Sequence, residues 1–210
     1  MSIKKVMVIG AGQMGGGIAQ VAAQAGYHVI LNDIKDEFVQ KGIGIIEKNL
    51  QRSVEKGKIT ADEKDAVLGR INPSTSLEDA SDIDIAIEAA SENMNIKTEI
   101  FRTLDRFAPA YAILATNTSS LPITEIAAVT NRPGQVIGMH FMNPVPVMQL
   151  VEIIRGLATS NEAFNMVHQM TVKMDKVPVE VNDSPGFVSN RLLLPMINEA
   201  VCCVYAAISG

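Results

Sequence analysis

The sequence predicts an α/β protein of the Rossmann type, built on a doubly wound and mostly parallel sheet. Apolar runs with strand character alternate with segments of helical periodicity, which is the pattern of a parallel sheet. The first run also ends in a glycine-rich turn that opens a helix, as in dinucleotide-binding units. The predicted strands are Lys5–Ile9, His28–Asn32, Ile71–Ser74, 83–88, 112–116 and Val136–Phe141.

The turn after the first strand has the glycine spacing of a dinucleotide fingerprint. Gly10 permits the tight turn, Gly12 lets the backbone approach a pyrophosphate, and Gly15 lets the helix pack closely on the strand. The helix N-terminus offers free N–H groups and the positive end of its dipole to the phosphates. Gln13 and Met14 lie within this turn and are therefore also expected to contact the cofactor.

The second strand is followed by Asp33, where an acid that binds the ribose is expected. A carboxylate at this position accepts hydrogen bonds from the ribose hydroxyls and repels a 2′-phosphate, which favours NAD over NADP. Lys35 lies two residues later and can weaken that repulsion. A flavin, or a glycine turn without a ligand, is the alternative interpretation.

Residues 35–69 are predicted to form a helical hairpin that projects from the sheet. Residues 35–58 are charged and amphipathic, and residues 60–68 form a second helical segment. The hairpin carries Lys48, Arg52, Lys56 and Lys58. These cations are either a solvated helix face or a landing surface for a phosphorylated ligand.

Two serines follow the predicted strand 112–116, at the carboxyl edge where open α/β sheets bind ligands. Ser119 or Ser120 can take part in catalysis, or can only cap the helix that begins near Pro122. Their spacing does not separate the two roles.

Residues 137–152 contain two strand-like runs separated by a proline-rich turn. If the second run folds back with its turn centred on Val145 and Pro146, His140 faces Glu152. The carboxylate then fixes the tautomer of the imidazole and stabilises its cationic form. Oxidation of an alcohol by hydride transfer requires a base for the hydroxyl proton, so the pair predicts a general acid–base. A histidine at a strand end is otherwise often structural.

Residues 184–186 interrupt the alternation of strands and helices, and they open a helix that runs to the end of the chain. The helix is apolar around most of its circumference and is therefore expected to be buried. We expect a homo-oligomer in which another copy covers this helix, or a shortened chain. The predicted division is a dinucleotide-binding domain at 1–183 and the start of a second, helical domain at 184–210.

Composition excludes several classes of protein. At 210 residues and 47% hydrophobic content, the chain can bury a sizeable core. The net charge of −5 argues against a nucleic-acid partner, because neutralising phosphates requires a basic face. The apolar run 6–9 is too short for a signal-peptide core or a membrane span, so we expect neither export nor a membrane partner.

The only cysteines are the neighbours Cys202 and Cys203. This spacing suits neither a disulfide framework nor a metal site, so no metal is expected and a reducing cytoplasm is the simplest location. Their simplest role is as small apolar residues of a buried helix.

Together these motifs resemble the short-chain (S)-3-hydroxyacyl-CoA dehydrogenase family. The similarity runs from about residue 3 to residue 200 and is carried by the segments VIGAGQMGGGIAQ, IEAASEN, TNTSSL, GMHFMNPVPVMQLVEIIRG and DSPGFVSNRLL. The resemblance implies hydride transfer between NAD(H) and C3 of a short-chain 3-hydroxyacyl-CoA or 3-oxoacyl-CoA, such as 3-hydroxybutyryl-CoA and acetoacetyl-CoA. The alternatives are an NAD-binding chain with weak or no activity, and a 2-hydroxyacid-type enzyme of the same superfamily.

The resemblance also implies roles for single residues. His140 is similar to the catalytic acid–base of the family, and Glu152 to its orienting partner. Ser119 matches the serine that contacts the substrate hydroxyl and the nicotinamide, and Asn190 matches the asparagine that positions the substrate. The implied cofactor contacts further include Glu92, Lys97 and Asn143, and the implied CoA contacts are Lys56 and Asn49. Members of the family continue through further helices that cover the substrate and form the dimer interface, so we expect the second domain to be incomplete.

Overall fold

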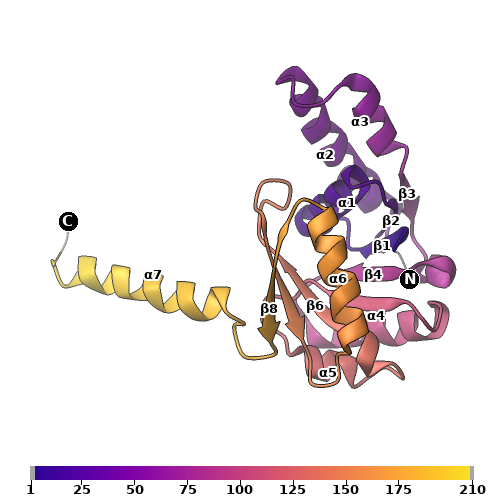
Figure 1. Cartoon of the computed structure of the whole chain (residues 1–210). Helices are drawn as coiled ribbons and strands as arrows, with labels where there is room; N and C mark the ends of the chain where they lie inside the picture. Colours follow the sequence, from indigo (N-terminus) through magenta and orange to yellow (C-terminus); the bar gives the residue numbers. More distant parts are fainter. Residues whose placement is uncertain (1–2, 209–210) are drawn as a thin grey trace.

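The computed structural model describes residues 3–208, which form one eight-stranded sheet covered by helices on both faces (Figure 1). The order across the sheet is β3-β2-β1-β4-β5-β6-β7-β8. The strands are β1 (Lys5–Ile9), β2 (His28–Asn32), β3 (Ile71–Ser74), β4 (Ile85–Glu88), β5 (Ile113–Thr116), β6 (Val136–Phe141), β7 (Leu150–Arg155) and β8 (Val177–Asn182).

The helices alternate with these strands along most of the chain. They are α1 (Gln13–Gln24), α2 (Asp36–Glu55), α3 (Ala61–Leu68), α4 (Met94–Phe107), α5 (Ile123–Ala127), α6 (Asn161–Lys173) and α7 (Ser189–Tyr205), with short 3₁₀ helices at Leu77–Asp82 and Pro133–Gln135.

The topology confirms the predicted Rossmann-type fold. Neighbouring strands pair in parallel throughout, except that β6 and β7 are antiparallel. The winding changes direction between β1 and β4, and ligands of doubly wound sheets bind outside the carboxyl ends of the strands at such a point. The carboxyl ends of β1, β4, β5 and β6 are therefore the place to search for a site.

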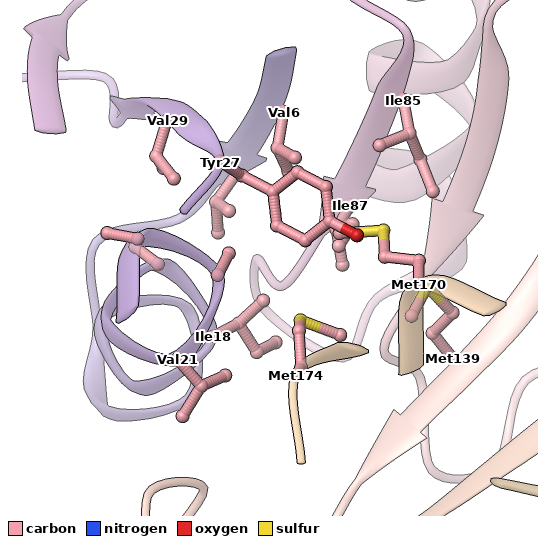
Figure 2. Packing of buried hydrophobic residues seen from close by; sticks show 14 of the residues in the cluster. Val6, Ile18, Val21, Tyr27, Val29, Ile85, Ile87, Met139, Met170 and Met174 are labelled. Atoms are coloured by element: carbon pink, nitrogen blue, oxygen red, sulfur yellow. The ribbon is translucent and has the colours of Figure 1, made fainter. Parts of the chain in front are cut away.

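Two apolar cores lie on opposite faces of the sheet. One face packs against α1, α2 and α6. Figure 2 shows part of it, with Ile18 of α1, Met170 of α6 and Met174, directly after α6, near the Tyr27 ring. Burial raises the pKa of the Tyr27 phenol. The other face packs against α4 and α5 through Phe101, Leu104 and their neighbours. Burial on both faces explains why the central strands are almost entirely apolar.

Some predicted boundaries are wrong. β4 begins at Ile85 and not at residue 83, because the Asp84 carboxylate accepts the N–H groups of residues 4 and 5 and holds the chain just before pairing begins. β5 begins at Ile113, one residue later than predicted. β8 was not predicted at all. It is an edge strand in which only Val181 is buried, so its sequence carries little of the apolar signal of a strand.

The predicted helical hairpin corresponds to α2 and α3, which project from the sheet in Figure 1. α2 buries a narrow stripe of residues that includes Val39, Ile46 and Leu50. α3 begins with a capping box in which the side chains and backbone N–H groups of Thr60 and Glu63 bond each other. The end of α3 also joins the core through Val67, so both helices of the hairpin are anchored to the rest of the fold.

The last helix lies apart from the sheet and its covering helices. α7 extends away from the rest of the chain in Figure 1, and none of its residues is buried within the part of the chain that the structure describes. Large apolar side chains are exposed along it, among them Leu192, Leu194, Met196, Val201 and Tyr205. Within residues 3–208 Cys202 is exposed and Cys203 is partly exposed, so their burial, like that of the whole helix, depends on what covers α7. Coverage of α7 by another copy or by further helices stays a prediction. Within residues 3–208, no helix is both long and apolar enough to cross a membrane.

Replacing each of two glycines of α2 by alanine distinguishes the effect of close packing from that of helix propensity. A Cβ at Gly42 would lie 2.7 Å from the Ala11 carbonyl oxygen, whereas a Cβ at the exposed Gly44 would meet nothing within 4 Å. We expect Gly44→Ala to raise the free energy of unfolding by about 1 kcal/mol, because alanine loses less conformational freedom in a helix. Gly42→Ala should lower it. Urea denaturation of both variants measures this, and changes of the same sign would contradict the close approach of α2 to the glycine turn.

Candidate active site

The glycine turn joins β1 to α1 at the carboxyl edge of the sheet. Gly10 has a φ of +99°, and a Cβ at Gly15 would lie 1.7 Å from the Gly10 carbonyl oxygen, so both positions require glycine. A Cβ at Gly12 would meet nothing within 4 Å. No side chain caps the first turn of α1, and this turn contains no acidic residue. The N–H groups at the start of α1 are therefore available to an anion.

Asp33 holds this turn from the end of β2. One carboxylate oxygen accepts the Ala11 N–H at 2.7 Å, and the other accepts the Ile34 N–H at 2.7 Å. Lys35 does not pair with Asp33 but lies 3.4 Å from a carboxylate oxygen of Glu37. The predicted ribose acid is therefore beside the glycine turn, and the nearest lysine is directed to another carboxylate.

A cavity of about 640 Å³ separates the glycine turn from α2 and from the loop after β6. Several predicted contact residues line it: Gly12, Gln13, Asp33, Asn49 and Asn143. Gln13 Nε2 donates to Asn143 Oδ1 at 3.0 Å, which ties α1 to the loop after β6. Met14 is half-buried and packs against the core, so it lies outside this lining. Lys56 is exposed at the end of α2 and does not line the cavity either.

The antiparallel pairing of β6 and β7 places His140 directly opposite Glu152, which confirms the predicted register. The Nδ1 atom of His140 lies 2.8 Å from Glu152 Oε2, and its Nε2 atom lies 3.1 Å from the Ser119 hydroxyl oxygen. His140 and Glu152 are only 5% and 1% exposed. When Nδ1–H donates to the carboxylate, Nε2 is left as the acceptor that faces Ser119.

Glu152 also holds the beginning of α7. Its Oε1 atom accepts the N–H groups of Val188 at 3.1 Å and Ser189 at 2.8 Å. Burial by itself would raise the pKa of the Glu152 carboxyl, but the hydrogen bonds from His140 and Ser189 outweigh it and hold the pKa below its ordinary value. Glu152 is thus a carboxylate that orients the imidazole with one oxygen and anchors a helix with the other.

The two serines whose roles could not be separated by spacing, and of which the resemblance favours Ser119, have different partners in the structure. Ser119 directs its hydroxyl to His140, whereas the Ser120 hydroxyl donates to Glu92 Oε1 at 3.1 Å. Asn190 Nδ2 donates to the Ser119 carbonyl oxygen at 3.2 Å. The four predicted catalytic residues, His140, Glu152, Ser119 and Asn190, therefore come together from β6, β7, the loop after β5 and α7.

Sequence reasoning missed Phe187. Its ring centroid lies 5.7 Å from that of the His140 imidazole, the side chain is 3% exposed, and the backbone has a φ of +50°. A phenylalanine directly after Pro-Gly, just before the helix that carries Asn190, was the available signal. The ring shields one side of the imidazole from water.

Glu92 and Lys97 lie beside the Ser119 loop. Glu92 Oε1 accepts the Thr118 hydroxyl at 2.5 Å and the Ser119 N–H at 2.9 Å. Burial alone would raise the pKa of the Glu92 carboxyl, but these hydrogen bonds and the charge of Lys97 lower it. Lys97 is only 1% exposed, with its ammonium between Glu88 and Glu92, so it lies beneath the cleft surface. Within residues 3–208, no group of three or more His, Cys, Asp or Glu side chains lies together as a metal site would require.

Comparison with known proteins agrees with this geometry. Residues 5–184 match the family described as 3-hydroxyacyl-CoA dehydrogenase, NAD binding domain. A probable 3-hydroxybutyryl-CoA dehydrogenase of Bacillus subtilis is 61% identical over 209 residues, which cover 100% of this chain and 73% of the relative. A 3-hydroxybutyryl-CoA dehydrogenase of Clostridioides difficile is 49% identical over 197 residues, 94% of this chain and 70% of the relative. The crystal structure of (S)-3-hydroxybutyryl-CoA dehydrogenase from Ralstonia eutropha superimposes with a TM-score of 0.97 at 47% identity, covering 100% of this chain and 74% of that one.

The lowered pKa of Glu152 predicts a dependence of stability on acidity. A carboxyl whose pKa is lower in the folded than in the unfolded protein stabilises the fold above its ordinary pKa, and this contribution is lost as the pH falls through the folded-state pKa. We therefore expect the free energy of unfolding to fall below about pH 4.5, and to fall less steeply in Glu152→Gln. Part of this pH dependence should remain in Glu152→Gln, because the pKa values of Glu92 and Asp105 are lowered as well. Urea denaturation across this range measures it. Glu47→Gln on α2 controls for the loss of one negative charge, and an unchanged slope in Glu152→Gln would contradict the prediction.

Proposed function

Since the chain belongs to the 3-hydroxyacyl-CoA dehydrogenase family, we propose that it interconverts a short-chain (S)-3-hydroxyacyl-CoA and its 3-oxoacyl-CoA by exchanging a hydride with NAD. The proposed substrate pair is 3-hydroxybutyryl-CoA and acetoacetyl-CoA, as the names of its relatives suggest. The observation that carries the proposal is the contact of His140 with both Glu152 and Ser119. A buried imidazole with one nitrogen held by a carboxylate and the other facing a hydroxyl suits proton exchange with an alcohol.

The glycine turn and Asp33 fit a dinucleotide. The uncapped start of α1 and the open space at Gly12 suit a pyrophosphate, and the Asp33 carboxylate suits the ribose hydroxyls. Gln13, Glu92 and Asn143 complete the proposed contacts. When bound, NAD supplies the hydride acceptor for oxidation, and NADH supplies the hydride donor for reduction.

His140 carries the proton in this proposal. In the oxidising direction its Nε2 atom takes the proton from the C3 hydroxyl, and in the reducing direction the same atom returns it. Glu152 keeps the proton on Nδ1 and stabilises the imidazolium that forms. Ser119 lies within hydrogen-bond distance of Nε2, where its hydroxyl orients the substrate oxygen.

Further residues of the chain are proposed to bind the substrate. Asn190 reaches the loop of Ser119 and positions the acyl group, whereas Asn49 and the exposed Lys56 of α2 bind CoA. We assign residues 1–183 to the NAD-binding domain and residues 184–210 to a helical unit. The exposed apolar side chains of α7 support a homo-oligomer through this helix, and the free cysteines support a cytoplasmic location.

Replacement of the acid–base tests this mechanism. Purified protein is expected to consume NADH in the presence of acetoacetyl-CoA, and His140→Gln should lower kcat by about two to four orders of magnitude. His168→Gln is the matched control and should leave kcat unchanged, because His168 lies in α6 with its ring against that of Phe164. Unchanged turnover in His140→Gln would overturn the assignment. Binding of NADH without any turnover in the original protein would favour the inactive alternative.

Replacement of Asp33 tests how the cofactor is chosen. Loss of one charge-assisted hydrogen-bonding group should weaken NADH binding by about one to two orders of magnitude in Asp33→Asn. NADPH binding should weaken less, because the repulsion of its 2′-phosphate is removed as well. Calorimetric titration of both cofactors measures the ratio. Asp36→Asn, whose carboxylate bonds only Gln40 within the described residues, is the control. Equal losses for NADH and NADPH would exclude Asp33 as the discriminating residue.

A further inference from the structure

A fully buried ion pair lies beneath the candidate site and has no role in the proposed mechanism. Glu88 ends β4 and Lys97 lies in the first turn of α4, and their side chains are 0% and 1% exposed. The ammonium lies 2.7 Å and 2.9 Å from the two carboxylate oxygens. Removing two charges from water costs much of what their attraction contributes, so a buried pair is weak evidence for stability alone. The pair lies at the carboxyl edge of the sheet, beside the candidate site, and this position suggests that it orders the loops of the site.

Glu88 joins three elements at that edge. Besides Lys97, its carboxylate accepts the Ala90 N–H at 2.7 Å and the Thr116 hydroxyl at 2.7 Å. Ala90 begins the loop toward α4, and Thr116 ends β5 directly before the Ser119 loop. All of these contacts are of normal hydrogen-bond length, and the carboxylate is saturated by them. Glu88 is therefore fixed in one orientation.

Lys97 links Glu88 to a second carboxylate, that of Glu92. The Lys97 ammonium lies 3.4 Å from Glu92 Oε2, while the other oxygen of Glu92 collects the donors of the loop after β5. Oε1 accepts the N–H groups of Ser119 at 2.9 Å and Ser120 at 3.1 Å, together with the hydroxyls of Thr118 and Ser120. A single carboxylate oxygen thus sets the backbone of the turn that presents Ser119 to His140.

The two carboxylates beside Lys97 have different roles. Glu88 binds the ammonium with both oxygens, so Lys97 attracts Glu92 without drawing its carboxylate off the Ser119 turn. Without the negative charge of Glu88, the buried ammonium would have Glu92 as its only carboxylate partner. Glu92 would then be drawn inward, away from the Ser119 and Ser120 N–H groups.

We propose that Glu88 is a positioning residue of the site, which acts through Lys97 and Glu92 to hold the turn that carries Ser119 at its distance from His140. The catalytic consequence rests on the proposed function, whereas the structural one does not. Lys97 consequently acts through Glu92 from beneath the surface of the cleft.

Glu88→Gln tests this relay in the full chain. The variant should lower kcat with NADH and acetoacetyl-CoA about ten- to a hundredfold, the scale expected when a catalytic hydroxyl is displaced by about an ångström. The KM for NADH should change less than threefold. The matched control is Asp105→Asn, which also removes a carboxylate from a partly buried ion pair and from a backbone N–H, and which bonds none of the residues around His140. Asp105→Asn should lower the unfolding temperature and leave kcat within twofold.

A double-mutant cycle and hydrogen exchange separate positioning from general destabilisation. If Glu88 acts through Glu92, Glu88→Gln should have less than a twofold effect on kcat when Glu92→Gln is already present. The Ser119 and Ser120 amides should exchange at least tenfold faster in Glu88→Gln than in Asp105→Asn. An equal loss of kcat in both backgrounds, or unchanged exchange of these amides, would overturn the proposal.

The relay can also be tested if Glu88→Gln does not fold or if the original protein is inactive. If Glu88→Gln does not fold, the double variant Glu88→Gln/Lys97→Met removes the unpaired buried ammonium and with it the inward pull on Glu92, so its Ser119 and Ser120 amides are expected to exchange within threefold of the original rate. Exchange of these amides at least tenfold faster in that folded double variant would overturn the relay. If the original protein consumes no NADH, the proposed function fails, whereas the exchange of the Ser119 and Ser120 amides still decides the structural relay.

Discussion

The reversed pairing of β7 against β6 is the constraint on which the site depends. It is the single antiparallel pair of the described sheet, and it places Glu152 opposite His140 on the same face. Because side chains alternate along a strand, a slip of one residue would turn one of the two away from the other. The same carboxylate then accepts the N–H groups of Val188 and Ser189, so the start of α7 is placed by the strand register as well.

Carboxylates that accept backbone N–H groups recur around the site. Asp33 holds the glycine turn, Glu92 holds the Ser119 turn, and Glu152 holds the start of α7. Each lies on one segment and fixes the loop of another, and hydrogen bonds to a charged acceptor are stronger than those between neutral groups. Loops at the edge of a parallel sheet lack ladder partners, and these bonds give them fixed positions. The chemistry of the site is thus built on the same interaction that orders its loops.

Two features at this edge of the sheet are unfavourable for the folded chain. Phe187 adopts a left-handed backbone conformation that few non-glycine residues take, and its buried ring lies against His140. Two buried charges, Glu88 and Lys97, are removed from water beneath the same loop. Both features lower stability by themselves, and both order the surroundings of the reacting groups. Departures from the rules of stable folding of this kind are expected where a site is held in one geometry.

Much of this protein was determined by its sequence alone. The strand and helix order, the glycine turn with Asp33, and the facing of His140 and Glu152 followed from periodicity and turn residues, because these are local patterns joined by a short reversal. The tertiary structure alone decided that Lys97 is buried between two carboxylates, that β8 completes the sheet and that the Phe187 ring lies against His140. These outcomes depend on how segments pack against one another in space, and neither burial against a remote element nor an ion pair across a loop leaves a periodic signal in the chain.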